Sequence, residues 1–154
     1  MFKAPPMLHE WLELRDALTR IMNDHRALCG VSQADPVAIS QIRWQMSSIS
    51  RQRAAWLLKV VNPTAERLAH TSGGGAWLAV QATMPAYRQT ISAFVLRWPI
   101  DAVVDDWPGY RQGVTALRST ILQRLRTEEI AIRALAAERD VPPVRAMPPI
   151  RQAI

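Results

Sequence analysis

The sequence predicts an all-α protein that folds as an antiparallel up-down four-helix bundle. Its long segments place apolar residues at steps of three, four and seven, which is the spacing of one helical face. The connections between them are short and contain Gly or Pro, and no segment alternates apolar and polar residues as a strand does. Apolar residues make up 49% of the 154 residues, enough for one globular domain, which we expect over residues 1–140.

The first helix is expected over about residues 7–28, and Gly30 supplies its end. Asp35 followed by Pro36 predicts the start of the second helix, because Asp caps free N–H groups and Pro suits the first turn. This helix is expected to run to about residue 61, where Asn62-Pro63 breaks or kinks it. The two apolar faces consist of Leu8, Trp11, Leu12, Leu18, Ile21, Met22 and Leu28, and of Ile39, Ile42, Met46, Ile49, Trp56 and Val60.

The third helix is expected over about residues 76–98, kinked at Pro85 or beginning there, and Pro99 ends it. A short helical piece over residues 64–70 precedes it, followed by Ser72-Gly73-Gly74-Gly75, which we interpret as a flexible connection. The apolar face of the third helix consists of Trp77, Val80, Met84, Tyr87, Ile91, Phe94 and Trp98.

The last long stretch, residues 109–139, predicts the fourth helix, which follows the turn signal Trp107-Pro108-Gly109. Its apolar face consists of Val114, Leu117, Ile121, Leu125, Ile132 and Leu135. Continuing this face through its gap leads to Glu128, so a carboxylate occupies a position that is expected in the core. Arg53 interrupts the apolar face of the second helix in the same way.

The tail, residues 141–154, contains two Pro-Pro pairs and is expected to be extended or disordered, or to pack as an arm on a neighbour. No apolar run is long enough to span a membrane, and the N-terminus lacks a signal-peptide pattern, so we expect a cytoplasmic protein without membrane contact. The single cysteine, Cys29, rules out an internal disulfide, and we interpret it as a small apolar filler.

The net charge of +6 comes mainly from Arg, which suits the recognition of phosphate or carboxylate groups. However, the arginines are spread along the whole chain, and no compact basic run or interleaved aromatic motif occurs. We therefore attribute the arginine content to a coding bias and do not expect nucleic-acid binding.

One pattern connects the helices to a known family. The fourth helix has Arg124, three further residues and then Glu128-Glu129, while His9 lies early in the first helix. With Val60-Val61-Asn62-Pro63 at the end of the second helix, the pattern resembles hemerythrin-like (HHE cation-binding) domains over residues 8–137. The resemblance implies a four-helix bundle in which inward-pointing His and carboxylate side chains hold a di-iron centre, with His9 and Glu128 at matching positions.

The ligand set of that family is not complete in this chain. There are three His in all, and residues 36–65 contain no His, Asp or Glu. When the apolar faces are aligned, the second helix offers Ser50 or Arg53, the third offers Tyr87, and the fourth has Arg124 in place of His. Because iron and manganese need several such ligands together, we expect no metal and no other cofactor.

An interior ion pair between Arg53 and Glu128 is our hypothesis for what replaces the metal, with Tyr87 or His9 completing the hydrogen bonds. Its physical reason is that a buried charge is costly unless it is paired. In one alternative, both side chains lie at the edge of the apolar faces and extend to water. In another, Arg124 and Glu128 pair along one helix, since they are one turn apart.

The leading functional hypothesis is a non-enzymatic interaction or regulatory module that has lost a hemerythrin-like metal centre. No motif such as Gly-x-Ser-x-Gly or His-Glu-x-x-His occurs, so we do not expect an enzyme. Its partner is expected to be another protein or a second copy of the chain. A residual metal-binding protein, with His9 and Glu128 as remaining ligands, is one alternative.

A second alternative is a sensor whose former metal cavity binds a small organic anion at Arg53 and Arg124. A cavity lined by Trp56, Tyr87 and these arginines would favour the sensor, whereas a filled core would not.

Overall fold

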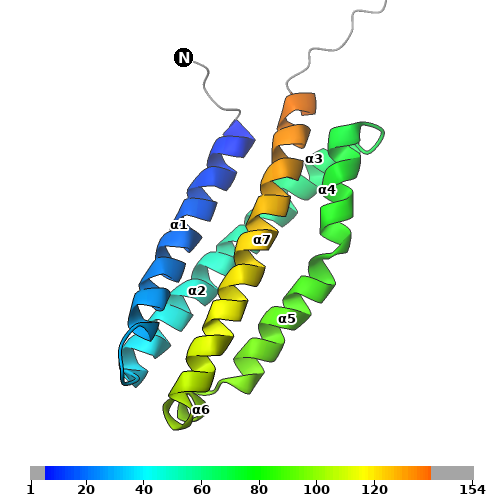
Figure 1. Cartoon of the computed structure of the whole chain (residues 1–154). Helices are drawn as coiled ribbons and strands as arrows, with labels where there is room; N and C mark the ends of the chain where they lie inside the picture. The colour runs from blue at the N-terminus through cyan, green and yellow to red at the C-terminus, as the bar shows by residue number, and fades with distance from the viewer. Residues whose placement is uncertain (1–5, 140–154) are drawn as a thin grey trace, which may run out of the picture.

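The computed structural model describes residues 6–139, and every regular element in that range is helical, which confirms the all-α prediction. Figure 1 shows that the chain runs along α1, returns along α2, descends through α4 and α5, and returns along α7. The tail predicted for residues 141–154 lies outside the described residues. The helices are α1 (Pro6–Cys29), α2 (Pro36–Trp56), η1 (Leu57–Val61), α3 (Asn62–Arg67), α4 (Ser72–Ala82), α5 (Met84–Arg97), α6 (Ile100–Asp105) and α7 (Trp107–Arg139).

Within residues 6–139, none of the helices combines the length and the apolar content that a membrane span needs.

The second helix begins as its cap signal predicts, since the Asp35 carboxylate accepts a hydrogen bond from the backbone N–H of Ala38 at 3.1 Å. Of the break or kink expected at Asn62-Pro63, the break does not occur, because the chain stays helical from α2 through α3. Instead, the π-helical turn η1 joins α2 to α3, and the N–H of Asn62 bonds to the carbonyl of Leu57. Pro63 then lies in the first turn of α3, where its missing N–H costs no hydrogen bond within that helix.

The prediction of a flexible glycine connection was wrong. Residues 72–75 form the first turn of α4, capped by Thr71, whose hydroxyl accepts a hydrogen bond from the N–H of Gly74 at 3.1 Å. A Cβ atom on Gly74 would lie 1.9 Å from the carbonyl oxygen of Leu68, and one on Gly73 would lie 2.6 Å from that of Ala134. The glycines therefore allow α4 to begin in close contact with α3 and α7.

The third predicted helix is two helices, α4 and α5, separated at Thr83 just before Pro85. Figure 1 shows that α5 changes direction relative to α4. No residue of α5 is buried, although Tyr87, Ile91 and Phe94 are half-buried against the core. The helix α5 is consequently the least covered of the long elements.

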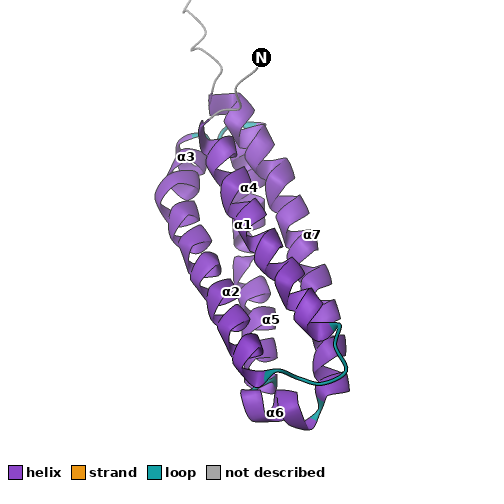
Figure 2. Ribbon diagram, turned by 90° about the vertical axis from the view of Figure 1, so that its left-hand side faces the viewer, coloured by secondary structure: helices purple, strands orange, loops and turns teal. Residues whose placement is uncertain are grey.

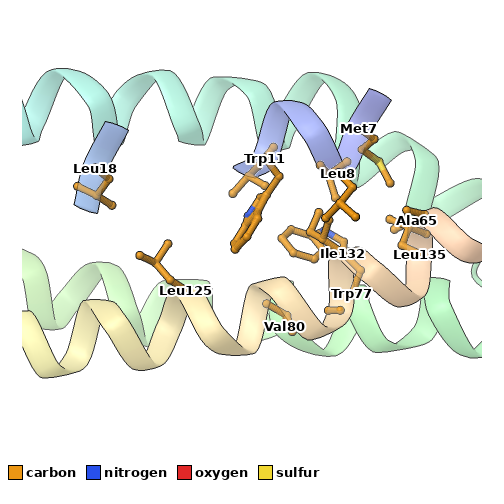
Figure 3. Packing of buried hydrophobic residues seen from close by; sticks show 14 of the residues in the cluster. Met7, Leu8, Trp11, Leu18, Ala65, Trp77, Val80, Leu125, Ile132 and Leu135 are labelled. Atoms are coloured by element: carbon orange, nitrogen blue, oxygen red, sulfur yellow. The ribbon is translucent and has the colours of Figure 1, made fainter. Parts of the chain in front are cut away.

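The fourth predicted helix begins at Trp107, two residues before the expected start, because Asp106 caps it through a 3.0 Å hydrogen bond from the N–H of Gly109. Its apolar face fills the core together with α1 and α4, and Figure 3 shows Trp11, Leu125 and Ile132 pointing into the space between these helices. A second cluster surrounds Tyr110 near the α6 end, where Figure 2 places the connection between α1 and α2.

Candidate functional site

A polar cluster lies inside this apolar core, centred on Glu128 of α7, which is 1% exposed. Its Oε2 accepts a hydrogen bond from Nη2 of Arg53 on α2 at 2.5 Å, and its Oε1 accepts one from Nε of Arg124 at 3.0 Å. The indole Nε1 of Trp11 on α1 also donates to Oε2, at 3.4 Å. Three helices therefore meet at one carboxylate, and the two ion pairs considered from the sequence are both present.

The other hydrogen bonds of Arg124 go to acceptors at the break between α4 and α5. Its Nη1 donates to the hydroxyl of Thr83 at 2.6 Å, and its Nη2 donates to the carbonyl of Val80 at 3.3 Å. The guanidinium carbon lies 5.2 Å from the centre of the Tyr87 ring, which is a cation–π distance. Arg124 is thereby held by the carboxylate, the end of α4 and the first turn of α5.

Tyr87 thus contacts the cluster through its ring face and not through the hydrogen bond that the hypothesis assigned to it. Burial raises the pKa of its hydroxyl, and the charges of Arg53, Glu128 and Arg124 act on it in smaller measure. The phenol therefore stays neutral and serves as a packing surface for the guanidinium.

His9 does not belong to the cluster. Its side chain is 63% exposed and lies 3.2 Å from Glu13 on the same helix. The reason is geometric: Met7 and Trp11 of α1 are buried, and a residue two positions from each of them lies on the opposite side of the helix. The expectation that His9 points inward was wrong.

The charges of the cluster do not balance. Arg53 and Arg124 are each 7% exposed, and they share the single carboxylate of Glu128, which leaves one positive charge in excess. In addition, Nε of Arg53 is buried without a hydrogen-bond partner among the described residues. Buried positive charge that exceeds its counter-charge is costly, so an anion placed beside the cluster would be stabilised electrostatically.

A cavity of about 420 Å³ adjoins the cluster between α2 and α5, with α1 and α7 behind it. The cavity exists because the side chains of α2 that line it are small and no residue of α5 is buried against them. The small side chains are Ser47, Ser50 and Ala54. Arg53, Tyr87 and Glu128 form part of its wall. The remaining lining residues are mostly apolar and include Leu18, Met46, Leu57, Met84, Ile91, Phe94, Val95, Leu117 and Ile121, with Arg43, Arg51 and Arg88 among the polar ones.

Two residues that the sequence suggested for such a cavity do not line it. Trp56 instead donates its indole N–H to Glu10 at 2.6 Å, and Arg124 faces Val80 and Thr83. Conversely, His25 lines the cavity, although no pattern in the sequence indicated this position. Its Nε2 lies 2.8 Å from the hydroxyl of Tyr110, and burial, with a smaller effect of Arg43, lowers its pKa to about 4, so it is neutral at pH 7.

A metal centre of the hemerythrin-like type does not fit these residues. Among residues 6–139, no group of three or more His, Cys, Asp or Glu side chains is arranged to hold a metal ion. Glu128 is engaged by two guanidinium groups, whose positive charge opposes a nearby cation.

Comparisons with protein-family models, with curated proteins and with solved structures found no match to this chain.

Proposed function

We propose that the protein is a non-enzymatic regulatory module that binds one amphipathic organic anion, a carboxylate with an aliphatic or aromatic body, between α2 and α5. The observation that supports this most directly is the excess positive charge of the Arg53–Glu128–Arg124 cluster beside a mostly apolar cavity. In this proposal the chain is an up-down four-helix bundle of hemerythrin-like type, in which an arginine-rich anion site takes the place of the metal centre.

The head of the ligand is assigned to Arg53, because Arg53 is the member of the cluster that both lines the cavity and has an unpartnered buried nitrogen. A ligand carboxylate would compensate the excess charge and form a charge-assisted hydrogen bond, which is stronger than a neutral one. Arg51 and Arg88 also line the cavity and add to its positive potential.

The body of the ligand is assigned to the apolar wall formed by Met46, Ile91, Phe94, Leu117 and Ile121. A volume of about 420 Å³ lies within the range of small-molecule sites. Burying apolar surface there contributes about 25 cal/mol per Å². A purely inorganic anion would gain nothing from this wall, which is why the proposal names an amphipathic ligand.

Regulation would follow from α5. This helix buries no side chain, and Leu96 on its outer side is 82% exposed. A ligand that fills the cavity adds packing contacts to the inner face of α5, which is only half-buried in the free protein, and so orders the helix. A protein partner or a second copy of the chain that contacts α5 would then respond to the ligand.

The test is calorimetric titration with decanoate, and with decanol as the uncharged counterpart of the same chain length. Decanoate is expected to bind and decanol to bind about tenfold more weakly, since one charge-assisted hydrogen bond is lost. Arg53→Met should reduce the affinity for decanoate to that for decanol.

A matched pair of variants tests the location. Ala54 lines the cavity, whereas the adjacent Ala55 is exposed and is not among the lining residues. Ala54→Phe should abolish decanoate binding, and Ala55→Phe should leave it unchanged. Equal effects of the two substitutions, or no binding of decanoate up to about 1 mM, would refute the proposal.

A further inference from the structure

A second cavity, of about 370 Å³, lies between the C-terminal end of α1 and residues 111–126 of α7. Figures 1 and 2 show these two helices side by side. We call it the basic groove, because arginines are the only charged residues that line it. Its lining consists of Arg26, Cys29, Arg111, Val114, Thr115, Arg118, Ser119, Leu122 and Arg126.

The arginines of the basic groove have no acidic partner in the described part of the chain. Among residues 6–139, none of Arg26, Arg111, Arg118 and Arg126 forms an ion pair, whereas Arg133 on the same helix pairs with Glu129 at 2.7 Å. Like charges placed along one helix face repel each other, so this arrangement does not serve the stability of the free protein.

Arg118 gives a second, independent indication. Its Nη2 donates to the side-chain oxygen of Asn23 at 2.8 Å, which fixes the guanidinium against α1. Its Nη1 is buried and has no hydrogen-bond partner among the described residues. A donor that is held in place, buried and unpaired in the wall of a cavity indicates a missing acceptor.

The arginines on α7 follow each other at steps of seven and eight residues, about two helical turns or roughly 11 Å of rise each. Because long side chains carry the guanidinium groups, the charged ends of successive arginines can approach one ligand from different sides. A ligand with two or more phosphate groups has charges at several points and so can engage more of them at once than a compact monoanion can. Guanidinium groups bind phosphate oxygens in a bidentate manner, and the hydroxyls of Thr115 and Ser119 supply further donors.

We propose that the basic groove binds a small anion carrying two or more phosphate groups, of which inorganic diphosphate is the simplest. A single-stranded nucleic acid fits less well, because no aromatic side chain lines the groove to stack a base. Cys29 takes no covalent part: burial raises the pKa of its thiol to about 11, so it is protonated near neutral pH.

The experiment is calorimetric titration of the full chain with inorganic diphosphate, with ADP and inorganic phosphate as comparison ligands. Diphosphate is expected to bind at least about tenfold more tightly than phosphate, since it engages more than one guanidinium. Equal affinities for ADP and diphosphate would assign recognition to the phosphates alone, and tighter binding of ADP would show that the groove takes a nucleotide. Both outcomes support the proposal.

Adjacent residues of α7 provide the controls. Thr115 lines the groove and Ala116 is exposed outside it, so Thr115→Glu should weaken diphosphate binding at least about tenfold and Ala116→Glu less than about twofold. Arg118→Gln should weaken it to a similar degree as Thr115→Glu, with a helical circular-dichroism spectrum unchanged. Ala54→Phe, which fills the cavity between α2 and α5, should leave the affinity for diphosphate unchanged. The diphosphate proposal and the decanoate proposal are therefore tested independently.

Three results would overturn the inference. The first is no diphosphate binding up to about 1 mM at low salt. The second is equal weakening by Thr115→Glu and Ala116→Glu, which would indicate attraction to the overall charge of the chain. The third is a single-stranded oligonucleotide that binds more tightly than diphosphate and loses that binding in Thr115→Glu, which would assign the groove to nucleic acid.

Discussion

Arg118 and Arg124 lie on the same helix, less than two turns apart, but one is paired with a buried carboxylate and the other is not. Arg124 is 7% exposed and donates to Glu128, Thr83 and the carbonyl of Val80. Arg118 faces the basic groove, donates to Asn23 and pairs with no carboxylate among the described residues. The same difference separates Arg53 from Arg126: one is buried against Glu128 and the other is exposed beside other arginines.

This contrast shows how one residue type serves two purposes. In the interior, where water does not screen charges, a guanidinium is tolerated because Glu128 lies next to it. In the basic groove, water and salt reduce the repulsion between arginines, so their charge remains available to a ligand. Arg124 should therefore matter mainly for stability and the arginines of the groove mainly for binding, whereas Arg53, which lines the cavity beside Glu128, should affect ligand binding more than stability. Substitutions can separate these roles.

The largest effect is expected for Glu128→Gln. This change leaves two buried guanidinium groups without a counter-charge and should lower the free energy of unfolding by roughly 3–5 kcal/mol. The measurement is urea denaturation followed by circular dichroism. Glu129→Gln is the matched control, because Glu129 is 25% exposed and pairs with Arg15 and Arg133 near the surface, so its loss should be below about 1 kcal/mol. Similar losses for the two variants would contradict the distinction between buried and surface pairs.

The sequence indicated the interior cluster because Glu128 and Arg53 each interrupt an apolar helical face. A charge at such a position either pairs or reaches water, and the structure shows that it pairs. The partners of Arg124 at Thr83 and Val80 were not predictable, because they depend on where the chain breaks between α4 and α5. His9 was assigned wrongly because the resemblance to a ligand position was given more weight than the helical spacing. That spacing places His9 opposite the buried Met7 and Trp11.

The basic groove could not be recognised from sequence in the same way. Its arginines are far apart in the chain and form no run, so they were attributed to composition. The spacing of Arg111, Arg118 and Arg126 places them on one helix face, but Arg26 and Asn23 join them only when α1 packs beside α7. The glycines at the start of α4 were misread for a related reason: the close approach to Leu68 and Ala134 that requires them is a tertiary contact.

A second test compares the two interior arginines with each other. Arg124→Met removes the hydrogen bonds to Glu128, Thr83 and the carbonyl of Val80 and should lower the free energy of unfolding by about 3 kcal/mol. Arg53→Met should cost only about 1 kcal/mol, because Glu128 remains paired with Arg124 and the excess charge disappears. Chemical denaturation of both variants measures the difference. A larger loss for Arg53→Met would show that the cluster carries no excess charge in solution.

A third test uses pH and the neutral polar pair of the core, His25 and Tyr110. Burial, and then the charge of Arg43, lower the pKa of His25 from 6.5 to about 4, so the folded protein excludes a proton that the unfolded chain binds. The free energy of unfolding therefore depends little on His25 well above pH 6.5 and decreases as the pH falls toward 4. The expected decrease is about 2 kcal/mol between pH 7 and pH 5. Urea denaturation across that range measures it, and His25→Gln should flatten the dependence. Glu129 does not contribute in this pH range, because the hydrogen bond from Arg133 lowers the pKa of its carboxyl group.

The smallest effect is expected in the basic groove. Arg111→Gln and Arg126→Gln should change the free energy of unfolding by less than about 0.5 kcal/mol, toward higher stability at low salt, because each removes like-charge repulsion. Thermal denaturation at low and high salt measures the change, and the difference from wild type should vanish as screening increases. Diphosphate should raise the melting temperature of the wild type more than that of either variant. A loss of about 2 kcal/mol in either one would instead make these arginines structural, and the contrast with Arg124 would then reflect depth of burial alone.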